Sequence, residues 1–333
     1  MQSQIQDLVR AFGLPPADTV ASLGGAGGYS GAKFWKVVTG DSTWCLRRWP
    51  PEHPDDARLA WLHQVLFHAS SHGFTRLPVP RRTLAGTTWL QTPEGRYELV
   101  PWIPGQADFH TRPSANRLRN AMHALAEFHQ AVREFPRLGP HRGPVPAVLR
   151  RREMIQRLEQ GGLAQLTQAV GRWPDPEVHR RGELLLAGFR SARHALAESL
   201  EMARTLVVDL QPCIRDLWHD HLFFRDEEVS GIVDFGAMQI DHVSVDLARL
   251  LGSLVADDQN QVRFALDAYC EKRPLSDPER QLVGLLDRTA IFLSGINWLE
   301  WICIERRVFE EPARVFSRLD ELVLRIRRQT LSG

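Results

Sequence analysis

Two aspartates that flank a predicted β-hairpin are the residues of this sequence best placed to do chemistry. Asp216 lies in a loop ahead of a short strand, and Asp234 follows the next strand in the run Asp-Phe-Gly at residues 234–236. A turn at residues 225–228 would bring the two loops together. Phosphoryl transfer requires one acidic group near the reacting hydroxyl and a second on a metal ion. A single aspartate in such a loop is more often a turn or cap residue, but the pair at this spacing indicates that chemistry.

A glycine-rich run between two predicted strands could hold an anion. Glycines let the backbone approach a ligand closely and turn N–H groups toward negative charge. The run does not open a helix, and no Gly-Lys-Ser/Thr follows it, so it is neither a dinucleotide-binding fingerprint nor a P-loop. Alone, it is equally typical of an ordinary hairpin. The run consists of Gly24, Gly25, Gly27, Gly28 and Gly31.

The elements that must position these loops change character along the chain. The first hundred residues predict an antiparallel sheet with two helices, at 4–12 and 57–71, and the strands lie within 20–38, 43–49, 87–91 and 96–100. Beyond residue 105 the apolar period becomes 3.6, and short β segments return between 206 and 234. Ser114 can cap one of the helices, and Gly161-Gly162 predicts a break in the helical stretch after residue 147. We therefore predict an α+β protein with a small antiparallel β-rich N-lobe over 1–100, a connector over 101–105 and a larger, mostly helical C-lobe over 106–333.

Length and composition exclude several classes of protein. At 333 residues the chain exceeds the roughly 250–300 at which one core stops growing, so two lobes are expected. Hydrophobic residues at 43% and charged residues at 24% are typical of a globular chain. A formal net charge of +1 gives no electrostatic case for a nucleic-acid partner. The cysteines lie far apart, which argues against a disulfide framework and a four-cysteine zinc site: Cys45, Cys213, Cys270 and Cys303.

The sequence also predicts neither a membrane partner nor export. The longest apolar stretch, residues 289–304, is interrupted by Asn297 and Glu300. The N-terminus has no basic start followed by an apolar block, as a signal peptide would. We expect a soluble, cytoplasmic protein.

From about residue 20 to 330 the chain resembles the aminoglycoside phosphotransferase and choline kinase family, relatives of the protein kinases. The specific part is Asp-Phe-Gly at 234–236 followed by Asp-Leu-Ala at 246–248, and the segment 125–129 is similar to a recurring helix of the family. The resemblance implies a bilobal, protein-kinase-like fold. It also implies ATP- and metal-dependent transfer of the γ-phosphoryl group to a hydroxyl of a small molecule, with Mg²⁺ or Mn²⁺ as the metal.

The resemblance assigns roles in the helical lobe. Asp216 matches the catalytic aspartate, Asp234 the metal-binding aspartate and Asp246 the residue that steadies the catalytic loop. His221 falls where the family has a metal-binding asparagine, and Ile214 stands in place of the histidine of its His-Gly-Asp motif. Imidazole is a poorer magnesium ligand than an amide oxygen, but it suits manganese or zinc better.

The resemblance also assigns a nucleotide site. Gly24, Gly25, Gly27, Gly28 and Ser30 would cradle phosphates, together with Arg47 at the position of the family's strand-three lysine. Arginine keeps the charge and can hold phosphate oxygens in bidentate fashion, but its planar head changes the reach. Lys36 could substitute only if its side chain points the same way. The helix over 57–71 contains no glutamate for the usual ion pair with the lysine.

The connector falls where the family grips adenine. Pro101 lacks an N–H but offers its C=O to the adenine amino group, and Ile103 keeps the N–H that a ring nitrogen needs. A stiff linker between lobes would explain the same prolines. The acceptor in this family lies among helices of the C-lobe, and candidates for its wall are Trp218, Trp298, Trp301 and Glu305.

Two other functions remain open. A binding protein that holds nucleotide without transferring phosphate would explain the replaced motif residues. A metal-dependent hydrolase would use a cluster of histidines and aspartates as ligands. Its candidates are His219, Asp220, His221, Asp234, Asp241 and His242.

Overall fold

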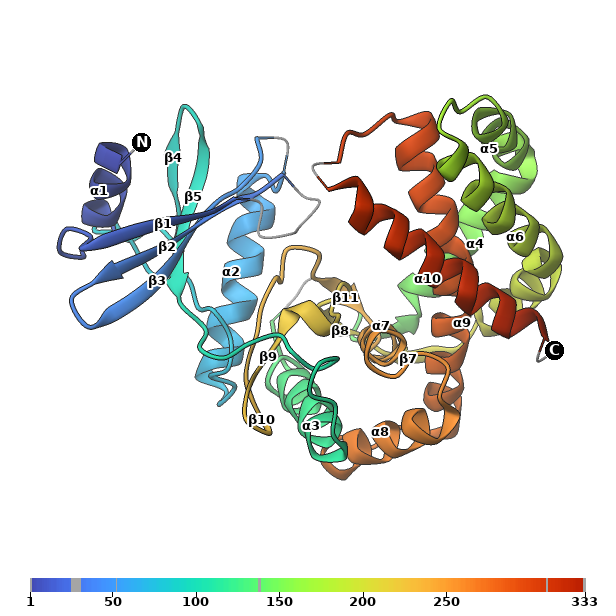
Figure 1. Ribbon diagram of the computed structural model, residues 1–333. Helices are drawn as coiled ribbons and strands as arrows, with labels where there is room; N and C mark the ends of the chain where they lie inside the picture. The colour runs from blue at the N-terminus through green and yellow to red at the C-terminus, as the bar shows by residue number, and fades with distance from the viewer. Residues whose placement is uncertain (1, 25–30, 52, 137–138, 310, 332–333) are drawn as a thin grey trace. The chain divides into compact units, whose positions relative to one another are not determined.

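The computed structural model describes residues 2–24, 31–51, 53–136, 139–309 and 311–331, which form two compact units (Figure 1). The first unit is Met1–Pro136 with Asp216–Met238, and the second is Arg137–Arg215 with Gln239–Gly333. This division differs from the boundary predicted near residue 100, because the first unit continues past the connector and takes in the hairpin segment. Both candidate aspartates, Asp216 and Asp234, therefore belong to the first unit.

A five-stranded antiparallel sheet opens the first unit. Its spatial order is β1-β2-β3-β5-β4, and the predicted strands are confirmed with shifted ends. On one face, alternate residues such as Trp35, Leu46 and Leu99 form a core with apolar residues of helix α1 (Gln2–Ala11) and with Phe12, which follows that helix. The strands are β1 (Thr19–Gly24), β2 (Lys33–Thr39), β3 (Ser42–Arg48), β4 (Leu90–Thr92) and β5 (Gly95–Pro101).

The opposite face of the sheet carries the charged side chains of Arg47 and Glu98 beside Phe34. Phe34 of β2 pairs with Arg47 of β3, and Arg47 pairs with Glu98 of β5, so all three point to the same side. Helix α2 (Asp56–Ser71) buries His63, and the Asp55 side chain caps its start by accepting from the Arg58 N–H at 2.7 Å. Arg47, His63 and Glu98 are all less than 10% exposed.

Helix α3 (Ala115–Ala131) and the hairpin of β9 (Leu222–Arg225) and β10 (Glu228–Ile232) complete the first unit. Ser114 caps α3, as the sequence predicts, by accepting from the Arg117 N–H at 3.0 Å. A short 3-10 turn, His219–His221, precedes β9. Phe235, directly after Asp234, is buried with its ring 5.5 Å from that of Phe128 on α3, which anchors the loop beyond β10.

The second unit is mostly helical. Two small antiparallel pairs join β6 (Arg142–Pro144) to β7 (Val207–Asp209) and β8 (Gln211–Cys213) to β11 (Gln239–Asp241). The predicted break at residues 161–162 is confirmed, because a π-helical turn ends there with Gly161 at φ 117°. The helices are α4 (Pro146–Arg157), α5 (Leu163–Gly171), α6 (Pro176–Ala203), α7 (Ser244–Leu254), α8 (Gln259–Lys272), α9 (Asp277–Leu299) and α10 (Pro312–Leu331).

One helix of the second unit is apolar along much of its length. By length and composition alone, the continuous helix Asp277–Ile304 could cross a membrane, with a mean hydropathy of 1.2 in its most apolar stretch. That stretch is 61% buried inside the protein, and α9 packs against α6, α7 and α10. This burial is typical of a core helix.

Candidate functional site

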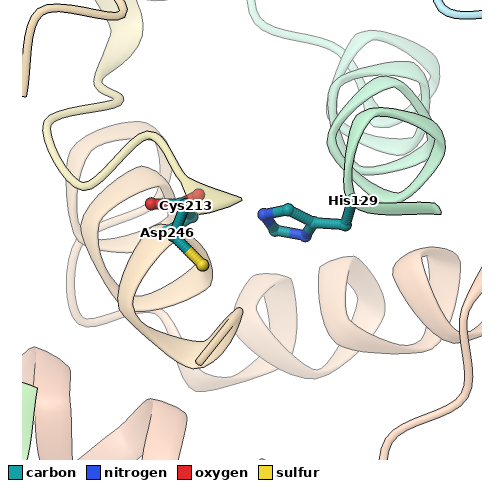
Figure 2. A group of neighbouring side chains, drawn as sticks. All are labelled: His129, Cys213 and Asp246. Carbon is teal, nitrogen blue, oxygen red and sulfur yellow. The ribbon is translucent and has the colours of Figure 1, made fainter. Parts of the chain in front are cut away.

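Asp246 holds the loop that leads to Asp216. At the start of α7, its Oδ2 accepts from the Ile214 N–H at 2.7 Å and its Oδ1 from the Arg215 N–H at 2.5 Å. Figure 2 shows its carboxylate beside Cys213, the last residue of β8; His129, also drawn there, is a buried residue of α3. Asp246 is fully buried, and hydrogen bonds to a carboxylate are stronger than neutral ones. The arrangement supports the loop-stabilising role predicted for Asp246, and Arg215 is held at a φ of 69° directly before Asp216.

Asp216 itself is exposed, and its main chain is tied to His221. The His221 Nδ1 lies 2.8 Å from the Asp216 carbonyl oxygen, and the Trp218 Nε1–H donates to the His221 Nε2 at 2.8 Å. An indole N–H can only donate, so Nε2 must accept. The ring proton is therefore on Nδ1, where it donates to the carbonyl. Trp218 thus covers the one lone pair that neutral His221 has for a metal.

Asp234 lies next to this loop. It adopts a left-handed φ of 60°, a conformation that aspartate tolerates better than most residues. Its Oδ1 accepts from the Gly236 N–H at 3.4 Å, and its Oδ2 lies 3.7 Å from the His221 Nε2. Burial opposes ionisation, but the charge of Arg47 and the hydrogen bond from the Gly236 N–H hold the pKa of Asp234 below its usual range. Its side chain is 41% exposed, so an anionic carboxylate is presented to a ligand.

Arg47 reaches Asp234 from strand β3. Its Nη2 lies 3.5 Å from the Asp234 Oδ1, and its guanidinium carbon lies 3.4 Å from the centre of the Trp49 ring. Its Nη1 is 3.9 Å from the Glu98 Oε1. Among the described residues, the Arg47 Nε is buried without a hydrogen-bond partner. At 3.9 Å the Nη1 makes no hydrogen bond to Glu98, so Arg47 has donor capacity left there for an anion such as a phosphate.

Lys36 does not take this role. It lies on the same face of the sheet as Arg47, but its ammonium nitrogen lies 4.8 Å from the centre of the Trp102 ring. The basic group in contact with Asp234 is therefore the arginine.

A buried carboxylate next to Arg47 is the main feature that the sequence reasoning missed. The family resemblance predicts a glutamate on the helix after strand three, whereas Glu98 stands on β5. The helix contributes His63 instead, whose Nε2 lies 2.7 Å from the Glu98 Oε2. Burial raises the pKa of Glu98, but the His63 hydrogen bond and the Arg47 charge outweigh it and lower the pKa overall. The sequence signal was a glutamate between Tyr97 and Leu99 in strand β5.

Six of the predicted site residues line one cavity of about 290 Å³ in the first unit. Aromatic and aliphatic side chains such as Phe34, Val100 and Phe223 complete a mostly apolar wall, as small-molecule sites typically have. Cys45 also lines it, and burial raises the pKa of its thiol to about 12. The six are Arg47, Pro101, Ile103, Trp218, His221 and Asp234.

The connector leaves the Pro101 carbonyl available to this cavity. The Trp49 N–H donates to the Arg96 carbonyl at 2.9 Å, and the Trp102 N–H to the Thr43 carbonyl at 3.1 Å. In an antiparallel ladder alternate residues bond to the same neighbour, so even-numbered positions of β5 bond to β3. Pro101 lies between them, and its C=O faces away from β3. A proline is therefore tolerated here without losing a ladder hydrogen bond.

The predicted acceptor residues of the second unit form a cluster of their own. Trp298 is 7% exposed, and its ring lies 5.1 Å from that of Trp301 in an edge-to-face contact. Arg307 lies over Trp301 at 4.8 Å and pairs with Glu305 at 2.6 Å. Trp298 therefore contributes to the core, while Trp301 and Glu305 lie nearer the surface.

The glycine run and His242 are the remaining candidates from the sequence. Gly24 ends β1 with a φ of 59°, but Gly25, Gly27, Gly28 and Ser30 lie outside the described residues. In the second unit, His242 is fully buried and bonds Ser244 at 2.8 Å and Glu279 at 2.9 Å. Both of its ring nitrogens are thus engaged within the protein, which speaks against its use as a metal ligand.

Comparisons with known proteins give the fold and family. The crystal structure of spectinomycin phosphotransferase with ADP and spectinomycin is similar to this chain, with a TM-score of 0.68 at 12% identity over 97% of both chains. The structure of amicoumacin kinase in complex with AMP-PNP, Ca²⁺ and Ami gives a TM-score of 0.59 at 12% identity, covering 97% of this chain and 92% of that one. These likenesses confirm the predicted kinase-like fold.

At the level of sequence, the homoserine kinase of Rhodopseudomonas palustris (strain BisB18) is 24% identical over 237 residues. The match covers 70% of this chain and 65% of that enzyme, just under two thirds of its length. The sequence model of the phosphotransferase enzyme family matches residues 24–281, which include the glycine run, Arg47, the connector and both aspartates. The chain belongs to the phosphotransferase enzyme family.

Proposed function

We propose that this protein is a small-molecule kinase that transfers the γ-phosphoryl group of ATP to a hydroxyl. The observation that carries the proposal is a cavity in the first unit where Arg47, Asp234 and the connector residues Pro101 and Ile103 meet. An apolar wall beside a backbone C=O and N–H suits a purine base. A guanidinium and a carboxylate at the same cavity suit a polyphosphate and its cation.

A divalent cation fits the donor set at Asp234. Carboxylate oxygens are the ligands that Mg²⁺ prefers, and the lowered pKa of Asp234 keeps it anionic. When bound, the cation would neutralise charge on the phosphates. We assign Asp234 as the main ligand. The His221 Nε2 lies 3.7 Å from the Asp234 Oδ2, so it could bind the same cation. It would do so only when the Trp218 N–H no longer donates to it.

Asp216 would act on the acceptor. Its carboxyl is exposed, while His221 fixes its carbonyl and Asp246 fixes the two residues before it. A carboxylate on a loop held in this way can orient a hydroxyl and take its proton as the phosphoryl group transfers. Arg47 and the backbone of the glycine run would steady the phosphates meanwhile.

The acceptor is a small hydroxyl compound. Trp218 lines the cavity beside His221 and is our candidate for contact with the acceptor. The relatives named above act on homoserine or on antibiotics, so amino alcohols and aminocyclitols are the first classes to test.

The test is an acceptor screen with the full chain, ATP and Mg²⁺. Homoserine, choline, spectinomycin and simple sugars would be supplied separately, and phosphorylated product would be measured by mass spectrometry. We expect one class to give product at a rate well above ATP hydrolysis without acceptor. Tight ATP binding without transfer to any acceptor would instead favour a nucleotide-binding protein that has lost transfer.

Replacing Trp218 by phenylalanine is expected to change the metal preference. Phenylalanine keeps an aromatic ring at this position, but the indole N–H that covers the His221 Nε2 is lost. Imidazole nitrogen suits Mn²⁺ better than Mg²⁺, so the ratio of Mn²⁺ to Mg²⁺ affinity should rise by about tenfold, as for other changes around metal ligands. Titration calorimetry of each metal with ATP present would measure it. The double variant Trp218→Phe/His221→Ala should lose the gain, and a gain that survives there would contradict this explanation.

A further inference from the structure

We propose that His63 is a positioning residue for Arg47 and acts through Glu98. This inference rests on the proposed function, because the group positioned is the one assigned to the phosphates. In this chain helix α2 would contribute an imidazole, that of His63, to the positioning of Arg47. The carboxylate beside Arg47, that of Glu98, would come from the sheet.

The geometry forms a chain of four side chains from β3 to the segment before β4. The His63 Nδ1 lies 2.7 Å from the Thr88 Oγ1, and its Nε2 lies 2.7 Å from the Glu98 Oε2. The other Glu98 oxygen faces the Arg47 Nη1 at 3.9 Å. Thr88 is 8% exposed and Glu98 is 5% exposed, so the chain is shielded from solvent.

His63 gives the buried Glu98 carboxylate a direct hydrogen bond. A buried carboxylate is costly unless it is paired and hydrogen-bonded. At 3.9 Å, Arg47 supplies charge but no hydrogen bond, whereas the His63 contact is at full hydrogen-bond distance. Since Thr88 engages the other nitrogen, the imidazole is fixed at both ends. His63 therefore sets where the Glu98 carboxylate stands.

Glu98 in turn sets where Arg47 stands. The guanidinium lies between two carboxylates, Glu98 at 3.9 Å and Asp234 at 3.5 Å, with the Trp49 ring beneath it. Without Glu98 in place, Asp234 would be the carboxylate left in contact with Arg47 among the described residues, and it would draw the guanidinium onto the group assigned to the cation. Glu98 holds the guanidinium back, so that Asp234 stays accessible to the cation and Arg47 to the phosphates at the cavity that both residues line.

If His63 positions Arg47, replacing His63 should weaken the binding of ligands that carry phosphates and leave the binding of other ligands unchanged. We expect His63→Phe to weaken binding of Mg·ATP by about tenfold, equivalent to about 1.4 kcal/mol, which is in the range for one buried hydrogen bond. Adenosine, which has no phosphate, should bind equally well to the variant and to the unsubstituted protein. His63→Gln should restore most of the ATP affinity, because its amide N–H can donate to Glu98.

Calorimetric titration of ATP with Mg²⁺, and of adenosine, would measure this. His68→Phe is the matched control, since it makes the same change on α2 away from the cavity lining. If His63→Phe does not fold, Glu98→Gln keeps the side-chain shape and should show the same loss specific to ATP.

The outcomes separate the inference from the proposed function. Equal losses for ATP and adenosine, or no loss for ATP, would overturn the positioning role and leave the kinase assignment intact. If the unsubstituted protein binds neither ATP nor adenosine, the proposed function fails and the inference falls with it.

Discussion

Asp216→Asn is expected to lower kcat for phosphoryl transfer by about 10²–10⁴-fold, the usual loss when a positioned base is removed. Asparagine has nearly the same shape, and the backbone contact that His221 makes is to the Asp216 carbonyl. The loop should therefore keep its conformation. The affinity for Mg·ATP should stay unchanged, because the nucleotide contacts that we propose lie at Arg47, Asp234 and the connector.

Steady-state kinetics with the acceptor found in the screen would measure this effect, together with ATP binding by calorimetry. Asp226→Asn is the matched control, because Asp226 is exposed in the turn of the β9–β10 hairpin with a φ of 51° that asparagine also tolerates. A kcat within a factor of a few of the unsubstituted protein would remove Asp216 from the reaction. A parallel loss of ATP affinity would indicate that the loop had been disturbed.

Asp234→Asn is expected to abolish the part of ATP binding that depends on the metal. The amide lacks the charge that the cation needs, and it also frees Arg47 from its 3.5 Å contact. ATP binding without metal should therefore persist or strengthen. Asparagine is preferable to alanine, because it tolerates the φ of 60° at this position and so separates the chemistry from backbone strain.

The melting temperature with ATP, with and without Mg²⁺, would measure this second effect. Ligand at 100 times its dissociation constant stabilises the folded state by about 2.7 kcal/mol, which a melt can resolve. In the variant, Mg²⁺ should add nothing to the shift given by ATP alone. A metal-dependent shift equal to that of the unsubstituted protein would mean that another residue binds the cation.

Local patterns in the sequence were sufficient for much of the fold. The hairpin turn at Gly40, the Ser114 cap of α3 and the break at Gly161 all follow from short-range rules for turns, caps and glycine. Asp246 was identified by its place in a motif, and its two backbone hydrogen bonds agree with the role expected there.

The features that could not be predicted depend on contacts distant in sequence. Glu98 meets Arg47 only because β5 pairs with β3 across the order β1-β2-β3-β5-β4, and His63 meets Glu98 only because α2 packs on that face. No local pattern carries this pairing. The Trp218 contact that covers the His221 lone pair likewise depends on the 3-10 turn, which a motif alignment does not reveal.

The measurement that tests the central claim most directly is the melting temperature of the unsubstituted protein with ATP, with Mg²⁺ or Mn²⁺ present or absent. We predict a shift with ATP that increases when either metal is added, because the cavity holds a guanidinium suited to phosphates and a carboxylate suited to the cation. No shift under any of these conditions would contradict the nucleotide site and the kinase assignment that depends on it.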